Sequence, residues 1–494
     1  MIRTSRVLAL TLLIALAASA CVPGVRAGAR CRTTDFGDDG TFVLRCQNGR
    51  WVRVATKAQV AQLIVSILRA RTTTTSTTTP STTTTAVPYG RDGTVRPVSV
   101  TSAGVAGDGR SDVGDISDDG RYVVFMTRST NLPAGSDTYG HIVLKDMTTG
   151  ALTRVSHIAG DTATESTGYS YRPSITPDGR YVVYESDSSD IVAVDTNGYS
   201  DIFRWDRLTG LNELISVSDG GAQGNDHSTN PSISDDGSRV VFESAATTLV
   251  AGDINGSQDL FLRIGSSTTL ISTDASGIAG DNTSNNATIS GDGNRVVFES
   301  YATNLVPGDT NGSTDVFVKR LSNSAIQRVS VRADGSQIAG SSYDASISAD
   351  GSKVAFVSQD NFIVAGDSGD TYDVFVRNVT AGTTTLASVT SSGGRLTDGG
   401  EQGMISANGR FVTFRSSSPE ITGGTSTQAF VRDLTGGTTF RASRASTGVE
   451  TPEVGAASIS ANGRYVTFTV MTAGLIASGD PTNQMYVFDR GSIS

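Results

Sequence analysis

Cysteine and histidine are scarce in this chain, with three residues of each among 494. The histidines, His141, His157 and His227, are scattered, and none stands in the His-x-x-x-His spacing of a zinc-binding helix. The sequence also lacks the G-x-S-x-G motif that would present a serine nucleophile. We therefore predict no catalytic residues, and we interpret the three histidines as ordinary loop residues.

Long apolar runs are also rare. One of them, Val7–Ala17, follows two arginines and is too short for a stable membrane span, so residues 1–20 are typical of a signal peptide. The following "ASAC" allows two outcomes: lipidation of Cys21, as in a bacterial lipoprotein box, or ordinary cleavage after Ala20. Ala18 departs from that box, where a larger aliphatic residue is usual. We expect an extracellular or cell-envelope protein, which is attached to the membrane only in the first outcome, through a lipid on Cys21.

Charged residues make up only 18% of the chain, and their distribution is uneven. Residues 1–71 carry a net charge of +8, and since the whole chain carries −10, residues 72–494 carry −18. An acidic main domain repels phosphate backbones, so no nucleic acid partner is expected, and cations are the more natural small ligands.

The N-terminal region predicts a small basic module over residues 21–71. Its pattern suggests two hairpins around "DDG" and "NG", clamped by a disulfide between Cys31 and Cys46 that leaves Cys21 for lipidation. The segment "TKAQVAQLIVSILRAR" predicts a short helix, which either covers the module or docks to an envelope partner. Residues 72–88 are Thr-rich, have nothing to bury, and predict a solvated linker.

Residues 89–494 are built from a repeat. The motif "SDDGRYVVF" from Ser117 is the first of seven copies, the last being "SANGRYVTF" from Ser460, and each copy holds four short strands. Asp-Gly or Asn-Gly between the first two strands predicts a type I′ hairpin with φ > 0 at both residues. The recurring aspartates are explained by turn chemistry, with the side chain bonded to backbone N–H groups. These turn aspartates are Asp119, Asp178, Asp236, Asp292 and Asp350.

The repeat predicts an all-β fold, a seven-bladed β-propeller. The chain ends in a third strand, "QMYVFDRGSIS", whereas residues 95–99 precede the first complete copy. This N-terminal strand can therefore complete the last blade and remove an exposed sheet edge.

The consensus "SISxDGRYVVF … GDxNGxxDVFVRD … TTxxxS" resembles the TolB-like, PD40-type (WD40-like) propeller repeats of exported bacterial proteins, over about 400 residues from Thr94. The resemblance implies the fold, but such propellers serve as binding platforms, as scaffolds beside hydrolase domains and occasionally as enzymes. Propeller lyases of this kind use a histidine cluster around a metal, which three scattered histidines do not suit. The N-terminal domain of TolB has no counterpart here.

The loop "GDTNGSTDVF" supports two interpretations. Its Asp, Asn and Asp resemble the first half of a calcium loop, although no acidic residue follows at position five and no downstream Glu closes the site. Alternatively, it is an Asx-turn with a left-handed glycine. The candidate calcium ligands are Asp195, Asn197 and Asp201; Asp253, Asn255 and Asp259; Asp309, Asn311 and Asp315; and Asp367 with Asp373.

The long loops of a propeller, between second and third strands and between blades, share one face, where ligands usually bind. Tyrosines that depart from the repeat there would suit a glycan or a protein partner, or would pack between adjacent loops. They are Tyr139, Tyr169, Tyr171, Tyr199, Tyr343 and Tyr372. We expect a non-enzymatic binding platform for an envelope protein or polysaccharide, stabilised by calcium in the first interpretation of the loop. The alternative is a divergent hydrolase or lyase acting on polysaccharide, which unpaired carboxylates in the channel would favour.

Overall fold

The computed structural model describes residues 93–133, 135, 139–365, 367, 371–443, 453–471 and 483–491, and the backbone of four strands between residues 22 and 56. The chain divides into two compact units, Met1–Thr85 and Ala86–Ser494. The predicted signal peptide, lipidation at Cys21, helix and Thr-rich linker lie outside the described residues. So does Cys31, and with it the predicted disulfide to Cys46.

The first unit contains one small sheet with the strand order β1-β2-β3-β4. Strand β1 runs parallel to β2, and the other two pairings are antiparallel, as two successive hairpins require. In the second hairpin Gln47 at the end of β3 pairs with Arg50 at the start of β4. The strands are β1 (Val22–Pro23), β2 (Phe36–Asp38), β3 (Phe42–Gln47) and β4 (Arg50–Thr56).

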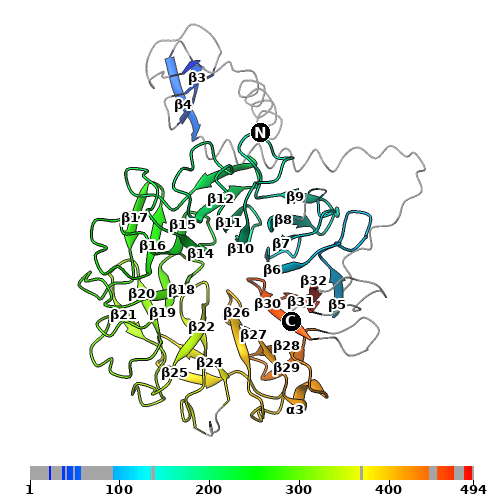
Figure 1. Ribbon diagram of the computed structural model, residues 1–494, viewed down its shortest axis with the longest axis vertical. Helices are drawn as coiled ribbons and strands as arrows, with labels where there is room; N and C mark the ends of the chain where they lie inside the picture. The colour runs from blue at the N-terminus through cyan, green and yellow to red at the C-terminus, as the bar shows by residue number, and fades with distance from the viewer. Residues whose placement is uncertain are drawn as a thin grey trace. The chain divides into compact units, whose positions relative to one another are not determined.

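The second unit is a ring of seven four-stranded antiparallel sheets, as Figure 1 shows, so the predicted seven-bladed propeller is confirmed. Within each blade the first strand lies nearest the centre of the ring. Blades 1 to 3 are β6 (Ser111–Ile116), β7 (Tyr122–Thr127), β8 (His141–Asp146), β9 (Leu152–Arg154); β10 (Ser170–Ile175), β11 (Tyr181–Ser186), β12 (Asp201–Asp206), β13 (Leu211–Leu214); and β14 (Ser228–Ile233), β15 (Arg239–Ser244), β16 (Asp259–Ile264), β17 (Ser267–Leu270).

Blades 4 to 7 repeat this order. They are β18 (Ser284–Ile289), β19 (Arg295–Ser300), β20 (Asp315–Arg320), β21 (Ile326–Arg328); β22 (Ser342–Ile347), β23 (Lys353–Ser358), β24 (Asp373–Asn378), β25 (Thr383–Leu386); β26 (Glu401–Ile405), β27 (Phe411–Ser416), β28 (Gln428–Asp433), β29 (Thr438–Arg441); and β30 (Val454–Ile459), β31 (Tyr465–Val470), β32 (Gln484–Asp489), with β5 (Thr94–Pro97) as the fourth strand.

Strand β5 closes the ring by pairing antiparallel with β32, so that Pro97 lies opposite Tyr486. The predicted closure by the N-terminal strand is therefore confirmed, although the strand spans 94–97 rather than 95–99. Within the described residues the one helix is α3 (Pro419–Thr422). None of the described helical segments is long and apolar enough to cross a membrane.

The core lies within the blades, where apolar residues of the second and third strands are packed between neighbouring sheets. In six blades an aromatic residue of the second strand stacks on one of the third, with ring centroids between 5.6 and 5.9 Å apart. Phe298 and Phe317 of blade 4 are both fully buried. Each such ring contributes roughly 1.5–3 kcal/mol through its burial.

The turn between the first two strands differs from the predicted type I′ hairpin. Only its glycine takes positive φ, for example Gly120 at 69°, while Asp119 keeps an ordinary backbone conformation. Gly120 N–H donates to Ser117 O (2.9 Å) and Arg121 N–H to Asp119 Oδ1 (2.9 Å). The aspartate thus stabilises the turn with its side chain, as predicted, and so makes a second left-handed residue unnecessary. Asp178, Asp236, Asp292, Asp350, Asn408 and Asn462 make the same bond.

Candidate functional site

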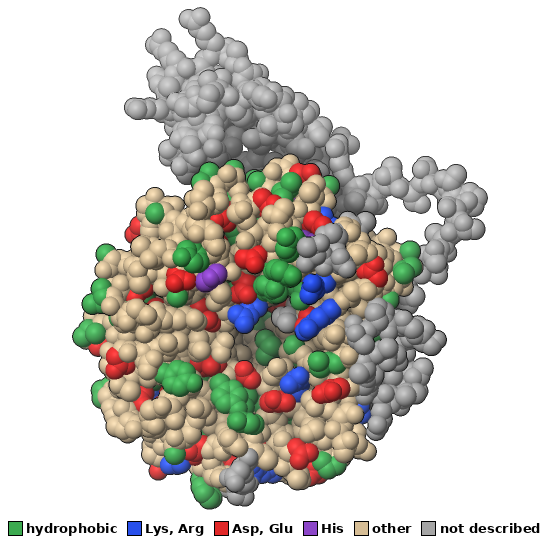
Figure 2. Space-filling model, viewed as in Figure 1, with side chains coloured by type: hydrophobic (Ala, Val, Ile, Leu, Met, Phe, Trp, Pro, Cys, Tyr) green, Lys and Arg blue, Asp and Glu red, His purple; other side chains and the backbone are tan. Residues whose placement is uncertain are grey.

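The connections between second and third strands and those between blades lie on one face, which we call the long-loop face. Exposed apolar side chains concentrate in these loops: Ile254 is 86% exposed, Val194 71% and Phe362 69%. Side chains of hydrophobic, basic and acidic residues also gather around the hollow at the centre of the ring (Figure 2). This combination of apolar and charged groups favours recognition of a ligand.

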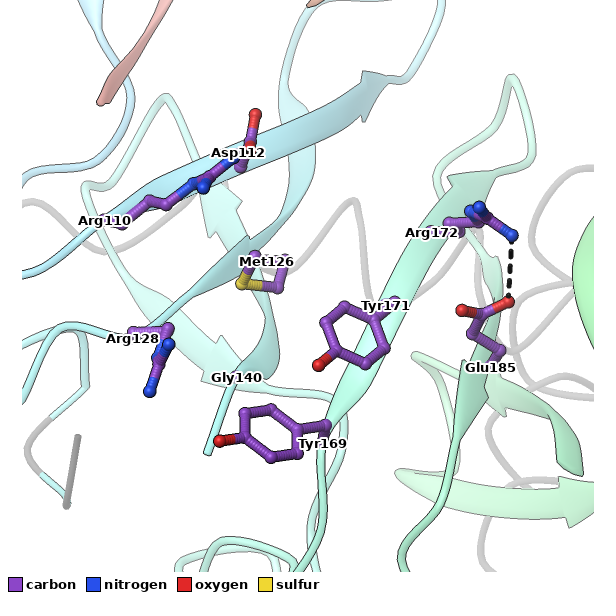
Figure 3. A pocket seen from close by; sticks show the side chains of 9 residues that line it. All are labelled: Arg110, Asp112, Met126, Arg128, Gly140, Tyr169, Tyr171, Arg172 and Glu185. Carbon is purple, nitrogen blue, oxygen red and sulfur yellow. Dashed lines mark hydrogen bonds and ion pairs between the residues drawn. The ribbon is translucent and has the colours of Figure 1, made fainter. Parts of the chain in front are cut away.

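A pocket of ≈ 450 Å³ opens on the long-loop face between blades 1 and 2 (Figure 3). Two of the predicted tyrosines, Tyr169 and Tyr171, line it with their rings stacked, the centroids 5.8 Å apart and the planes 9° from parallel. Tyr139 meets the edge of Tyr169 at 5.2 Å and 87°. Tyr171 remains 37% exposed, so the stacked pair presents aromatic surface at the pocket.

Charged groups surround this tyrosine pair. The Arg128 guanidinium lies 5.6 Å from the Tyr169 ring centroid, a cation–π distance. Arg110 pairs with Asp112 on the opposite wall, and Arg172 Nη1 lies 3.6 Å from Glu185 Oε2. Planar rings beside donors and acceptors of both charges can bind a ligand that has apolar faces and many hydroxyl or carboxylate groups.

Arg172 reaches the pocket because its backbone is left-handed, with φ of 48°. It lies in a β-bulge of the innermost strand, between Tyr171 and Ser174, where the register with β11 shifts. The same left-handed bulge recurs in four further blades, at Asn230, Asn286, Asp344 and Gln402. Non-glycine residues rarely adopt this conformation, so neighbouring contacts must stabilise it.

In three of these five blades a buried glutamate of the preceding blade supplies such a contact. Glu185 Oε2 accepts the N–H of Asn230 (2.8 Å), and Glu243 Oε1 accepts the N–H of Asn286 (2.7 Å), each in the next blade. In the same way Glu299 accepts from the N–H of Ala345, more weakly at 3.4 Å. Burial raises the pKa of Glu299 to about 7 despite these bonds. These glutamates are not among the residues predicted from the sequence, although the dipeptide "ES" at the end of three second strands marks them.

Unpaired carboxylates in the channel would favour a hydrolase or lyase, and these three glutamates are not unpaired, because each accepts a hydrogen bond within the described residues. They link one blade to the left-handed bulge of the next and therefore act in assembling the ring.

A second aromatic group lies on the same face in blade 5. Tyr343 and Tyr372 meet at 5.5 Å and 63°, and both line a shallow depression of ≈ 640 Å³ together with Phe362. Phe362 is exposed, and its φ of 69° is unusual for a bulky residue. The remaining predicted tyrosine, Tyr199, packs at 5.0 Å on His227 and lines neither pocket.

The histidines differ from the sequence interpretation in one respect. His141 does not lie in a loop but begins β8, where it is buried with Nε2 3.3 Å from Glu165 Oε2. Burial lowers its pKa, opposed by the charge of Glu165. His157 is buried between backbone carbonyls, and His227 accepts the Ser200 N–H in a loop (3.0 Å). None of these contacts joins two of the three histidines.

The second aspartate of each predicted calcium loop begins a third strand. There it accepts the hydroxyl of the serine that lies two residues after the fourth strand, as Asp315 Oδ1 does from Ser330 Oγ (2.6 Å). The asparagine forms an Asx-turn, since Asn311 Oδ1 accepts the Ser313 N–H (3.0 Å). No cluster of three or more His, Cys, Asp or Glu suited to a metal occurs among the described residues. The same serine contact is made by Asp201, Asp259 and Asp373.

No protein-family model matches this sequence, and no curated protein matches it. Solved structures with a similar fold include TolB from Acinetobacter baumannii (18% identity, 65% of this chain and 63% of that chain, TM-score 0.38). Others are an oligogalacturonate lyase in complex with manganese (13%, 81% and 96%, 0.48) and the β-propeller domain of the Trilobed protease from Pyrococcus furiosus (10%, 77% and 95%, 0.47).

The chain spans less than two thirds of the length of that TolB structure. At these identities the likeness is one of fold. The seven-bladed propeller itself is shown by the strand order of this chain, and a propeller fold does not specify a function.

Proposed function

We propose that this chain is an exported β-propeller that binds a polysaccharide on its long-loop face without chemically altering it. The observation that supports this most is the stacked pair Tyr169 and Tyr171, which lines an open pocket with arginines and carboxylates at its rim. The near-parallel rings offer an apolar surface to the faces of sugar rings, and the rim offers hydrogen bonds to hydroxyl groups.

The second aromatic group extends the proposal along the same face. Tyr372 is 43% exposed and Phe362 still more, so an extended chain of sugars has a second contact beyond the first pocket. Two separated contacts raise the affinity for a long polymer over that for a short fragment, because the second contact forms at high effective concentration.

The experiment is isothermal titration of the full mature chain with soluble plant and bacterial cell-wall polysaccharides, using long polymers and short fragments of each. We expect saturable binding of at least one polymer, at least tenfold weaker binding by the Tyr171→Ala variant, and weaker binding of its fragments. Tyr301→Ala is the matched control, since Tyr301 is 45% exposed yet lines neither pocket.

Three results would count against the proposal. A steady increase in reducing ends or unsaturated ends during incubation would make the chain an enzyme, the alternative function. Binding that Tyr171→Ala leaves unchanged would move the site elsewhere. Failure of every polysaccharide, combined with capture of an envelope protein that Tyr171→Ala abolishes, would assign the pocket to a protein partner.

Export and anchoring form a separate part of the proposal, supported by the sequence of residues 1–21. Mass spectrometry of the mature N-terminus tests it. A lipid-modified Cys21 that Cys21→Ser abolishes would establish the anchor, whereas a free N-terminus after Ala20 would establish simple secretion.

A further inference from the structure

Four blades carry two aspartates six residues apart before the third strand, and the structure shows which side chains contact each pair. In blade 4, Arg328 Nη1 lies 3.0 Å from Asp315 and 3.6 Å from Asp309. Gln337 Nε2 donates to both carboxylates, at 3.0 and 2.8 Å. The chain thus supplies its own positive charge and hydrogen bonds to the buried pair.

In blades 2 and 5 other side chains contact the paired aspartates. In blade 5, Arg395 Nη2 lies 2.9 Å from Asp373 and 3.5 Å from Asp367, so that a guanidinium again stands between two carboxylates. In blade 2, Gln223 Nε2 donates to Asp195 (2.9 Å) and Asn197 Nδ2 to Asp201 (2.8 Å).

Blade 3 keeps the aspartates but lacks these partners. Equivalent bridges pair Val217 with Gln223, Val331 with Gln337 and Val389 with Arg395, but in blade 3 they pair Thr273 with Ala279, whose methyl group can neither donate nor carry charge. The position of Arg328, opposite the third-strand phenylalanine, is occupied by Leu270. The remaining amide, Asn255, donates to Gly280 O (2.8 Å).

Asp253 is buried, with only 4% of its surface exposed. Because the partners are missing, neither of its carboxylate oxygens is hydrogen-bonded within the described residues. Asp259, fully buried beside it, accepts the Ser272 hydroxyl. Burial first, and the charge of Asp259 second, raise the pKa of Asp253 to about 6. A buried carboxylate without donor or countercharge is costly, so a missing partner is the simplest explanation of the pair.

We propose that blade 3 binds one calcium ion between Asp253 and Asp259, at the place where blades 4 and 5 carry an arginine. Carboxylate oxygens are the ligands that calcium prefers, and with two carboxylates the site depends on backbone carbonyls and water to complete six to eight ligands. Magnesium, which keeps its own waters and demands stricter geometry, suits such a site less. This ion is a structural partner of one blade and is independent of polysaccharide binding.

Thermal unfolding of the full mature chain in excess chelator and in rising calcium tests the proposal. We expect the wild-type midpoint to rise by several degrees as calcium exceeds its Kd a hundredfold, and equilibrium dialysis to give one ion per chain. Magnesium or sodium alone should have a smaller effect. Asp253→Asn should abolish the calcium dependence, whereas Asp309→Asn, its counterpart in blade 4, should keep it.

Ala279→Arg is the variant that separates a metal site from a merely strained loop. It copies Arg395 of blade 5, so it should raise the midpoint in chelator and remove the response to calcium. Identical melting of the wild-type chain in calcium and chelator would overturn the proposal. A calcium response that persists in both Asp253→Asn and Ala279→Arg would overturn it equally, because the ion would then bind elsewhere.

Discussion

The two faces of the ring use the same repeat in opposite ways. The face opposite the long-loop face carries the short turns between first and second strands, and we call it the short-loop face. There all seven turns place an Asp or Asn before a left-handed glycine and make the same side-chain bond. On the long-loop face four blades carry a pair of aspartates six residues apart, and glutamine or arginine contacts these pairs in blades 2, 4 and 5, whereas Asp253 of blade 3 has no hydrogen-bond partner within the described residues.

The difference teaches where variation is tolerated. The short turns contact the preceding blade: a Cβ on Gly237 would overlap the ring of Tyr181, and one on Gly120 would overlap Tyr465 across the closure of the ring. Any change there affects two blades. The long loops face solvent beyond their aspartates, so their side chains are free to diverge and to take up ligands.

The largest expected effect breaks a short turn. Gly237→Ala combines a left-handed alanine with the overlap on Tyr181, and should lower the free energy of unfolding by ~2–4 kcal/mol. Gly312→Ala on the long-loop face is its matched control. Gly312 is also left-handed but has open space around it, so the loss should be only about 1 kcal/mol. Equal losses by denaturant unfolding would contradict the distinction between the faces.

The next effect concerns pH. The pKa of Glu299, near the long-loop end of β19, is raised by burial to about 7. A carboxyl group whose pKa is higher in the folded than in the unfolded chain stabilises the fold fully at pH values below its unfolded-state pKa. This stabilisation, here on the order of 2 kcal/mol, is lost as the pH rises through the folded-state pKa of about 7. Glu299→Gln should therefore reduce the loss of stability between pH 5 and 8.

The turn carboxylates should show the opposite sign. The Ser234 hydroxyl, by hydrogen bonding, lowers the pKa of Asp236, so its stabilisation is lost only as the pH falls below the usual range for aspartate. Melting curves of Glu299→Gln and Asp236→Asn across pH 3–8 check both. Glu213→Gln, a substitution of an exposed glutamate, is the control and should leave the profile between pH 5 and 8 unchanged.

A smaller effect tests the turn bond itself. Asp178 Oδ1 accepts Thr176 Oγ1 (2.6 Å) and the Arg180 N–H (2.9 Å), so Asp178→Ala should cost about 1 kcal/mol. Asp178→Asn should be nearly neutral, because Asn408 makes the same pair of bonds in blade 6. A large loss in the asparagine variant, measured by urea unfolding, would show that charge rather than hydrogen bonding stabilises the turn.

The smallest effect on stability is expected at Tyr171. Its ring is partly exposed and stacked on one side, so Tyr171→Ala should change the free energy of unfolding by less than about 1 kcal/mol. Since the same variant should lose polysaccharide binding, calorimetry of unfolding and of binding together separate a ligand contact from a packing contact. A loss of stability above 2 kcal/mol would assign the tyrosine to loop packing.

The blades, their number and the closing strand could be predicted because each depends on short-range patterns: alternating apolar residues, a turn glycine, and a chain end that lacks one strand. The links between blades could not. Glu185 meets the N–H of Asn230, which lies 45 residues away in the chain, and no local pattern records that distance. The error about His141 has the same origin, since its burial beside Glu165 depends on how the start of β8 meets a segment that follows the blade's fourth strand.

The sequence by itself determined a seven-bladed, all-β ring and the position of every turn aspartate, because a repeat imposes the same local bonds in every copy. Tertiary structure alone decided which residues of neighbouring strands and loops meet. It stacks Tyr169 on Tyr171, places Arg328 and Arg395 between pairs of aspartates, and puts Ala279 at the bridge position that Gln337 and Arg395 occupy in blades 4 and 5. Aspartate pairs with the same spacing thereby acquire different surroundings, because the charge around a buried carboxylate depends on segments that lie far from it in the chain.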